Sequence, residues 1–405
     1  MLDQAASSLT NIAVLVIAAR DSTVHGFATF SMVYLTFTVL LGLNMAYVGQ
    51  AVVLTRGDTG AACRSAVSFT ALAATAVGAL LAAVGAVTAV VTDGWAGPGG
   101  AFLALGLVLP LVLVQDGLRY AFSTLRRPGL ALAADSLRLV CAVPALLLLP
   151  RHTAPGLLVA VWGLSAVPAL LLGLRLLWPH VRGARADLLP YVRRGHLGQR
   201  FVVEFAVGNA SSQLAVLGLG LFAAPLAVGA LRGATTLFGP LNVLFNSVNA
   251  FGPPLLGRLR GRRATARAAA VLGLALCAVG LAWGLVLYAL PDSVGRQLLG
   301  ATWQSASALL PASGAQYAVM GLGTCALVTL RVLSPRATLS VQVVFSLLSV
   351  VLMLGGYLLS GSALGAAWGL AAGSALKAVA AWTRVARPRA EERPTAAPVP
   401  AVPTG

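Results

Sequence analysis

Residues 101–149 read AFLALGLVLPLVLVQDGLRYAFSTLRRPGLALAADSLRLVCAVPALLLL. Two apolar runs, 101–122 and 130–149, flank a short turn that contains Arg126, Arg127 and Pro128. A helix of about 20 apolar residues is roughly 30 Å long, which matches the hydrocarbon thickness of a bilayer. The stretch therefore predicts a transmembrane helical hairpin whose tight end carries positive charge.

Similar apolar runs recur from one end of the chain to the other. Read against the need for about 20 apolar residues per span, the predicted segments are 3–20, 27–54, 66–91, 101–122, 130–149, 155–178, 200–223, 226–256, 264–290, 304–330, 337–360 and 362–386. The sequence thus predicts an all-α polytopic membrane protein of about twelve transmembrane helices.

The composition excludes a water-soluble domain. Of the 405 residues, 58% are hydrophobic and 10% are charged, and the mean hydropathy is +0.88. Soluble domains carry about 25% charged residues. The net charge of +17 could indicate nucleic-acid binding. However, the basic residues lie in short loops between apolar runs, so we expect no nucleic-acid partner and attribute the charge to membrane topology.

The basic residues also predict the orientation. If the N-terminus is cytoplasmic, all but six of the 28 Lys and Arg residues belong to cytoplasmic segments, and this count includes Lys377. The exceptions are Arg20, Arg151 and Arg296 in outer loops and Arg119, Arg138 and Arg232 within spans. Because Lys and Arg are enriched in cytoplasmic loops, we expect a protein of the cytoplasmic (inner) membrane with both termini in the cytoplasm.

Two polar segments divide the chain. The stretch 179–199 is the longest internal polar segment, and the end of the chain is rich in Pro, Ala and charge. The expected organisation is an N-terminal six-helix bundle at 1–178, a cytoplasmic connecting loop at 179–199, a C-terminal six-helix bundle at 200–386 and a disordered cytoplasmic tail at 387–405.

Charged residues interrupt the fourth and fifth spans. Asp116 and Arg119 are three residues apart on one span, and Asp135 and Arg138 are three apart on the next. Such pairs share a helical face. Folding the hairpin at its Arg-Pro turn places Asp116 opposite Arg138, and Arg119 opposite Asp135. The group could be a neutral structural clamp, or a site where an arginine is shared with an anionic substrate.

A polar stripe follows the eighth span. Its members recur every three or four residues and so lie on one helical face; they are Arg232, Thr235, Gly239, Asn242, Asn246 and Asn249. Helix packing is the simpler explanation, because small and amide residues are common where membrane helices touch. Arg232 favours a cavity, since no acidic residue lies within one turn of it and a buried arginine suits a phosphate or a carboxylate.

Other polar and helix-breaking residues complete the list of candidates. Glu204, near the cytoplasmic end of the seventh span, could titrate in a proton-coupled step or simply be solvated. Several prolines within spans predict kinked or broken helices: Pro110, Pro144, Pro168, Pro240, Pro253, Pro254 and Pro311.

The sequence carries no recognisable catalytic or metal-binding motif. It has no phosphate-binding loop, no metal-ligand spacing and no nucleophile elbow, and its four cysteines are scattered singly. The four histidines lie in predicted loops, and the outer loops are too short for a catalytic domain. We therefore expect no enzyme, no catalytic residues, no metal and no cofactor.

Three stretches resemble the polysaccharide-biosynthesis (O-antigen-type) flippases of the multidrug/oligosaccharidyl-lipid/polysaccharide (MOP) exporter superfamily. They are DQAASSLTN at 3–11, QDGLRY at 115–120 with the Arg-Pro turn that follows, and VGALRG at 228–233 continuing to GPLN at 239–242. The resemblance implies two six-helix bundles that form a V around a central cavity, as in the related MATE transporters, and open alternately to each side of the membrane.

The resemblance also implies a function. Such flippases export a lipid-linked saccharide or a related precursor of a cell-surface polysaccharide, and the pyrophosphate of this cargo suits an arginine in the cavity. The implied partners are that substrate, membrane lipids, a proton or sodium ion as coupling ion, and proteins of polysaccharide assembly. The candidate cavity residues are Arg119, Arg138, Arg232, Thr235, Asn242, Asn246 and Asn249, with Asp116, Asp135 and Glu204 as clamp or coupling groups.

Two alternatives stay open. A cation-coupled multidrug antiporter of the MATE type usually has a protected carboxylate deep in the N-terminal bundle, and the expected pairing of Asp116 and Asp135 with arginines argues against it. A non-transporting membrane component of a polysaccharide assembly complex is the second alternative.

Overall fold

The computed structural model describes residues 2–54, 57–206, 211–222, 225–256, 259, 261–333 and 335–387. Every regular element in this part of the chain is helical, and each predicted apolar run is occupied by helix. The predicted tail from 388 onward lies outside the described residues.

The N-terminal half has helices over each of the first six predicted spans. Its elements are α1 (Leu2–Asp21), α2 (Val24–Asn44), η1 (Met45–Gly49), α3 (Gln50–Leu54), α4 (Thr59–Thr88), η2 (Ala89–Asp93), α5 (Pro98–Thr124), α6 (Pro128–Leu147), α7 (Pro155–Leu164) and α8 (Val167–Val181). Two spans include a π-helical turn, and the sixth is divided into two helices, α7 and α8.

A short helix, α9 (Leu189–Val192), lies in the connecting segment before the C-terminal half begins. The elements that follow it are α10 (Leu197–Phe205), α11 (Ser211–Phe222), α12 (Pro225–Leu237), α13 (Gly239–Leu256), α14 (Arg262–Tyr288), α15 (Asp292–Leu299), η4 (Gly300–Thr302), α16 (Trp303–Ser307), α17 (Leu310–Leu333), α18 (Pro335–Ser360) and α19 (Ala363–Ala386). The sequence did not predict α15, which lies in a segment expected to be an outer loop.

Within the described residues, nine stretches are long and apolar enough to cross a membrane. The three remaining predicted spans are α1, α10 with α11, and α12 with α13. The described residues between α12 and α13 contain a turn at Phe238, so that span is not one long helix, and residues 207–210 between α10 and α11 lie outside the described residues. The chain is therefore a multi-pass membrane protein whose helices follow the predicted spans.

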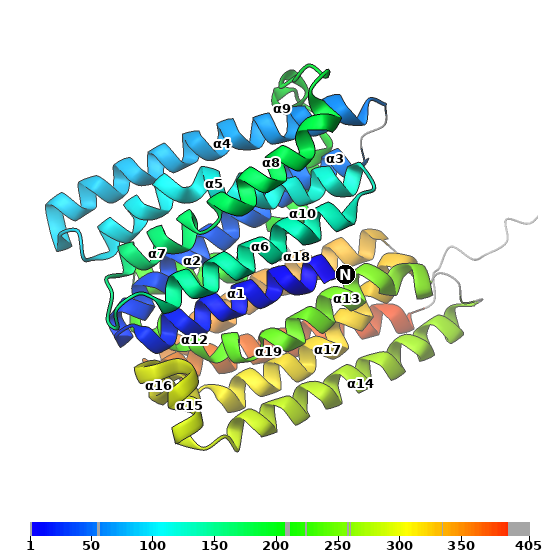
Figure 1. Cartoon of the computed structure of the whole chain (residues 1–405). Coiled ribbons are helices and arrows are strands. Elements are labelled where there is room, and N and C mark those ends of the chain that lie inside the picture. The colour runs from blue at the N-terminus through cyan, green and yellow to red at the C-terminus, as the bar shows by residue number, and fades with distance from the viewer. Residues whose placement is uncertain are drawn as a thin grey trace, which may run out of the picture.

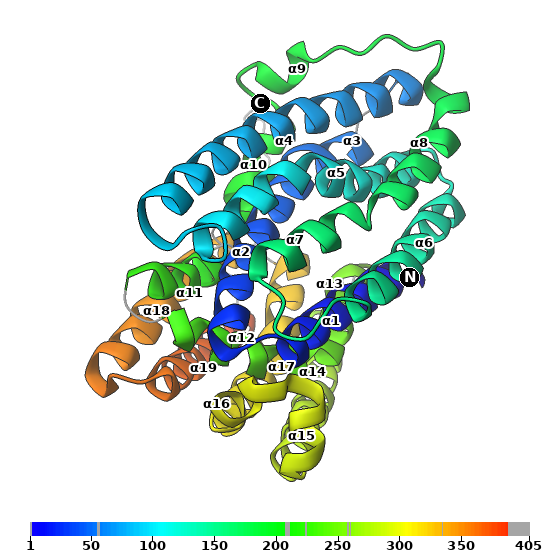
Figure 2. The ribbon, with the colours of Figure 1, turned by 60° about the vertical axis from the view of Figure 1, so that its left-hand side comes forward.

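The two halves lie side by side and share an apolar interior. In Figure 1 the helices from α2 to α8 fill one side, α14, α17 and α19 fill the other, and α1 and α12 run between them. Figure 2 shows the same division after a turn. One cluster of buried side chains joins the halves, with Phe27 and Trp162 from one and Phe238 and Tyr317 from the other. Outward-facing residues are also apolar; Leu359, for example, is 92% exposed, as lipid contact requires.

Helices break at two of the predicted prolines, Pro168 and Pro240, whereas Pro110 and Pro144 lie within the continuous helices α5 and α6. A turn at Phe238 separates α12 from α13, and Pro240 follows it. The amide of Leu241 donates to Phe238 O at this break, which leaves Leu237 O free of its usual helical partner. Trp283 Nε1 of α14 donates to Leu237 O at 2.9 Å. A side chain thus satisfies the carbonyl that the break exposes.

Replacing Trp283 by phenylalanine should therefore destabilise the fold. The change keeps an aromatic ring but leaves Leu237 O without a donor, which costs about 1–3 kcal/mol for a buried polar group. Thermal unfolding in detergent micelles measures the loss. Trp368→Phe is the matched control, because Trp368 is 49% exposed. Equal melting temperatures for the two variants would contradict the proposed role.

The connecting segment docks onto the N-terminal half. Arg64 NH1 donates to Ala184 O at 2.6 Å, and Asp187 N donates to Ser65 Oγ at 2.8 Å. Tyr47, in the π-helical turn η1, donates its hydroxyl to Tyr191 O. The helix that follows, α10, packs on α2 and η1 so closely that a Cβ at Gly198 would lie 2.1 Å from Tyr47 O.

His196 connects this docked segment to α10. Its Nδ1 accepts a hydrogen bond from Gly198 N at 3.1 Å and so caps the helix. Its ring lies 5.0 Å from the Tyr47 ring and 4.8 Å from the Tyr191 ring, measured between centroids. Partial burial here lowers the pKa of His196 below its usual range.

A lowered pKa makes the docking of α10 pH-dependent. The unfolded state binds the proton more readily, so the contribution of neutral His196 is complete above the ordinary histidine pKa of about 6.5 and is lost as the pH falls. We expect amide hydrogen exchange in 197–205, corrected for intrinsic rates, to accelerate on acidification. His196→Asn, which keeps a capping oxygen without titrating, should abolish that acceleration. An unchanged pH response in this variant would contradict the prediction.

Candidate functional site

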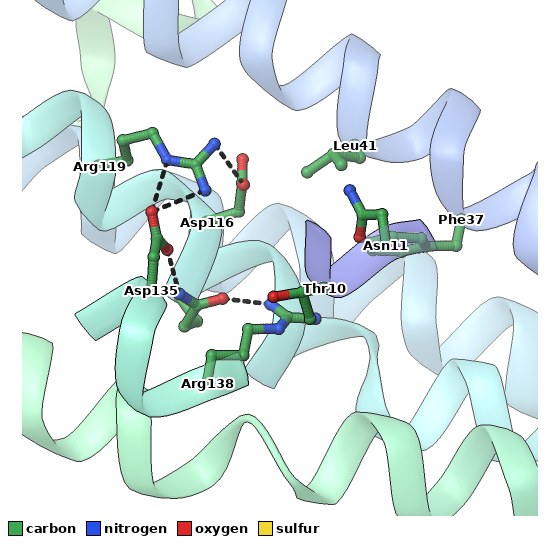
Figure 3. A pocket seen from close by; sticks show the side chains of 9 residues that line it. Thr10, Asn11, Phe37, Leu41, Asp116, Arg119, Asp135 and Arg138 are labelled. Atoms are coloured by element: carbon green, nitrogen blue, oxygen red, sulfur yellow. Dashed lines mark hydrogen bonds and ion pairs between the residues drawn. The ribbon is translucent and has the colours of Figure 1, made fainter. Parts of the chain in front are cut away.

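A small polar pocket lies between α1, α2, α5 and α6 (Figure 3). Its free space, about 20 Å³ for the centres of water-sized spheres, holds one or two waters. The residues that line it are Thr10, Asn11, Phe37, Leu41, Gln115, Asp116, Arg119, Asp135 and Arg138. We call Gln115, Asp116, Arg119, Asp135 and Arg138 the hairpin cluster.

Arg119 is the centre of the hairpin cluster. Its Nε and NH2 each lie 3.1 Å from Asp135 Oδ2, and its NH1 lies 3.3 Å from Asp116 Oδ1. The side chains of Arg119 and Asp135 are only 14% and 5% exposed. Figure 3 shows the guanidinium between the two carboxylates. The predicted pairing of Arg119 with Asp135 is therefore confirmed.

The predicted pairing of Asp116 with Arg138 is wrong. Asp116 pairs instead with Arg119 on its own helix, because residues three apart on a helix lie within reach of one another. Arg138 NH1 donates to Gln115 Oε1, and Gln115 Nε2 donates to Asp135 Oδ1 at 3.1 Å. Gln115 thus links Arg138 to the cluster without an ion pair.

Arg138 forms no ion pair with a described carboxylate. Among the described residues no carboxylate lies within 4 Å of its guanidinium, which also lies over the Trp162 ring, with the ring centroid 5.8 Å from Cζ. Arg138 is 9% exposed. A guanidinium has five N–H donors, so a buried arginine without a carboxylate partner is suited to donate to an anion.

Arg232 of α12 is the counterpart of Arg138 in the C-terminal half. Its Cζ lies 5.5 Å from the centroid of the Tyr34 ring, which belongs to α2. Its Nε is buried and has no hydrogen-bond partner. The Tyr34 hydroxyl donates to Asn11 Oδ1 at 3.0 Å. A cation–π contact between the two halves therefore occupies the arginine only in part.

Three aromatic rings connect the two arginines. The Tyr34 centroid lies 5.5 Å from that of Trp162, and the Phe37 centroid lies 4.7 Å from that of Trp162. We call Tyr34, Phe37 and Trp162 the aromatic bridge. Arg138 contacts the bridge at Trp162 and Arg232 contacts it at Tyr34. The two cations thus come from different halves and meet one shared buried surface.

The remaining members of the predicted stripe contact protein. Thr235 Oγ1 donates to Leu231 O at 2.9 Å, and Asn242 Nδ2 donates to the Tyr317 hydroxyl at 3.2 Å. Asn249 Nδ2 donates to Phe245 O at 3.0 Å, and its Oδ1 lies 3.5 Å from Arg331 NH1. The side chains of Asn246 and Glu204 lie outside the described residues.

The structure therefore divides the predicted site. The hairpin cluster and Arg232 meet around the aromatic bridge, whereas Asn242 and Asn249 bond to α17 and to the backbone of α13. Sequence reasoning missed Gln115, Tyr34 and Trp162. Gln115 lies beside Asp116 within a span and could have been found as a buried amide, but the two aromatics carry no signal that separates them from ordinary core residues. Among the described side chains, no group of three His, Cys, Asp or Glu could hold a metal ion.

Comparison with solved structures identifies the fold. The structure is similar to that of the lipid II flippase MurJ in an inward closed conformation, with a TM-score of 0.69 and 10% identity over 95% of this chain and 87% of the other. It is also similar to an inward-facing multidrug resistance MATE family transporter of the MOP superfamily, with a TM-score of 0.64 and 12% identity over 94% and 93% of the two chains. A third match is the MATE multidrug transporter DinF-BH, with a TM-score of 0.62, 13% identity, and 95% and 92% covered.

These matches define first a class, an all-α polytopic membrane protein. More particularly, the chain has the fold of these MurJ and MATE structures, so the fold that the sequence resemblance implied is confirmed. No protein-family model matches the sequence, and no curated protein matches it either. The O-antigen-type branch stays a prediction.

Proposed function

We propose that this protein is a flippase that moves a lipid-linked saccharide, a precursor of a cell-surface polysaccharide, across the cytoplasmic membrane by alternating access. Residues 1–178 and 200–386 form the two moving bundles, and both termini are cytoplasmic. The likeness to a lipid II flippase supports the cargo class, and the excess of basic residues in alternate loops supports the orientation.

The observation that carries the proposal is a pair of buried arginines that form no ion pair with a described carboxylate. Arg138 and Arg232 come from different halves and contact one aromatic bridge, and among the described residues neither has a carboxylate within 4 Å. Arg232 Nε has no partner at all. A buried cation without a counter-charge costs free energy unless it binds an anionic partner. A pyrophosphate offers several anionic oxygens, which suits two guanidinium groups.

The hairpin cluster then holds the site in place. Arg119 neutralises Asp116 and Asp135, and Gln115 orients Arg138. Because both carboxylates are engaged by an arginine, neither is free to bind a cationic drug or to exchange a coupling ion. The cluster therefore favours the flippase over the multidrug antiporter.

Transport requires a second conformation. The described pocket holds only a water or two, which is far too small for a lipid-linked saccharide. Separation of the halves would part Arg232 from Tyr34 and expose both arginines to a common space. The cation–π contact is therefore a closure contact that an anionic head group replaces.

A transport assay in proteoliposomes tests the proposal. Fluorescent undecaprenyl-pyrophosphoryl saccharide is placed in one leaflet, and its arrival in the other is followed by quenching with a membrane-impermeant reductant. We expect the protein to accelerate this movement and to leave the efflux of an organic cation such as ethidium unchanged. Efflux of the organic cation without movement of the saccharide lipid would identify the antiporter. The absence of both movements would favour a non-transporting component.

A further inference from the structure

Lys377 is the only lysine of the chain. The charge count of the sequence placed it with the cytoplasmic residues, and the structure corrects this. Lys377 lies inside α19, nine residues before the helix ends at Ala386. Its Nζ donates to Ser346 Oγ of α18 at 3.1 Å.

Helix geometry places this amine far from either end of the hairpin that α18 and α19 form. Lys377 is about 14 Å from the end of α19 at a rise of 1.5 Å per residue. Ser346 is about 16 Å from the start of α18 by the same measure. Because the two helices are antiparallel, the end of α19 and the start of α18 lie on the same side of the membrane, and both distances are measured from that side. A hydrocarbon core is about 30 Å thick, so the amine lies near its middle.

Lys377 also faces protein and not lipid. Gly365, Gly369 and Gly373 precede it at four-residue intervals, on the same face of α19. A Cβ at these positions would lie 2.3 Å from Gly356 O, 2.1 Å from Leu352 O and 2.4 Å from Ser349 Oγ, respectively. This face is therefore the contact with α18. At that depth and on that face, a lysine cannot extend its amine to the membrane surface.

Beyond α10, the described part of the C-terminal half offers this amine no counter-charge. Between residues 205 and 390 the sequence contains one acidic residue, Asp292. Asp292 lies in α15, outside the long helices, and accepts a hydrogen bond from Trp303 Nε1 at 2.8 Å.

The elements packed against α19 carry titratable groups but no described carboxylate. The titratable groups are Tyr357 on α18, Tyr317, Cys325 and Arg331 on α17, and Arg232 on α12. Arg262 of α14 lies at the end of α19. The basic groups among them would repel a charged amine. A permanent ammonium ion would thus be unpaired in the membrane interior, where an isolated charge costs several kcal/mol.

We propose that Lys377 is a proton-binding site through which protons are coupled to transport. When the C-terminal bundle is sealed, as described here, the neutral amine is retained between α18 and α19 by its bond to Ser346. When the bundle opens to water on one side, the amine takes a proton from that water and becomes an ammonium ion. The ammonium ion passes through the sealed state in the direction in which the anionic cargo neutralises it, and opening to the other side returns the proton to water there. The neutral amine returns without cargo, so one proton crosses in each cycle.

This proposal rests on the proposed transport function, and it is tested first in the same proteoliposomes. A pH gradient should accelerate transport of undecaprenyl-pyrophosphoryl saccharide severalfold in the wild-type protein. Lys377→Met, which keeps the length of the side chain without a titratable group, should transport at the rate seen without a gradient and should not respond to one. Arg296→Ala, at an exposed position in α15, is the control and should respond as the wild type does.

Each outcome of that assay has a defined meaning. If the wild type transports and Lys377→Met keeps its full response to the gradient, the lysine proposal is wrong and the flippase proposal stands. If the wild type does not transport at all, the flippase proposal fails, and a second measurement decides the role of the lysine.

The second measurement does not depend on transport. Protein labelled with ¹³C,¹⁵N-lysine and reconstituted in nanodiscs has a single lysine side chain, which Lys377→Met assigns by deleting its NMR signal. We expect the signal to move between the positions of the neutral and charged amine over the pH range used for transport. A signal that remains at the position of a solvated, charged lysine over that range overturns the proposal.

Discussion

Replacing Arg232 by alanine is expected to reduce transport of the lipid-linked saccharide by at least about thirtyfold, which corresponds to 2 kcal/mol or more for the loss of a buried, hydrogen-bonded charge pair. The guanidinium already lacks a hydrogen-bond partner at Nε and lies over the ring of Tyr34. Its removal leaves no buried carboxylate unpaired, so the protein should fold and reach the membrane. The rate in proteoliposomes, normalised to the amount of inserted protein, measures the effect.

Two further variants test whether transport depends on the positive charge itself or on the position of that charge in the protein. Arg232→Lys should recover part of the rate, because an ammonium group still attracts a phosphate but cannot bind it bidentately. Arg296→Ala removes the same charge from an exposed site and should transport normally. If Arg232→Ala transported at the wild-type rate, Arg232 would have no role in binding the substrate.

Replacing Arg119 by methionine is expected to have the largest effect on stability. The substitution leaves Asp116 and Asp135, the two carboxylates that Arg119 contacts in the wild-type protein, together in a buried site. Breaking one side of a buried ion pair costs about 3–5 kcal/mol. Thermal unfolding in detergent micelles should therefore show a large fall in melting temperature, whereas Arg175→Met, at an exposed position of α8, should show little.

The charge, and not the lost volume, should account for that fall. Adding Asp116→Asn and Asp135→Asn to Arg119→Met removes the unpaired negative charges and should recover part of the stability. Asp135→Asn alone should be milder than Arg119→Met, because its amide oxygen can still accept from Gln115 and Arg119. A triple variant less stable than Arg119→Met would show that the cluster is not held together by charge neutralisation.

The helices were predictable because a chain that crosses the lipid bilayer can adopt very few backbone conformations. A run such as 101–122 must form a helix to satisfy its backbone in hydrocarbon, and α5 covers it with a few residues to spare. The breaks near Pro168 and Pro240 follow equally directly from the missing amide. The helix α15 was missed because it is short and lies between spans, where neither length nor hydropathy marks it.

The site was only partly predictable. Periodicity placed Arg119 opposite Asp135 correctly, since an antiparallel hairpin determines which residues are level. It failed for Asp116, because a bond along the same helix competes with one across the hairpin and spacing alone does not decide between them. The contact of Arg232 with Tyr34 depends on how two distant helices, α2 and α12, pack, and no local pattern encodes it. Lys377 was assigned to the cytoplasmic side because the charge count did not distinguish a basic residue within a helix from one in the loop that follows it.

Binding of the anionic head group tests the central claim most directly. Native mass spectrometry of the protein with undecaprenyl-pyrophosphoryl saccharide, and with an undecaprenyl glycoside that lacks the pyrophosphate, compares the two lipids on one protein. We predict that the wild type and Arg296→Ala retain the pyrophosphoryl lipid in preference to the neutral one, and that Arg232→Ala loses this preference. Equal retention of both lipids by the wild-type protein would contradict the account.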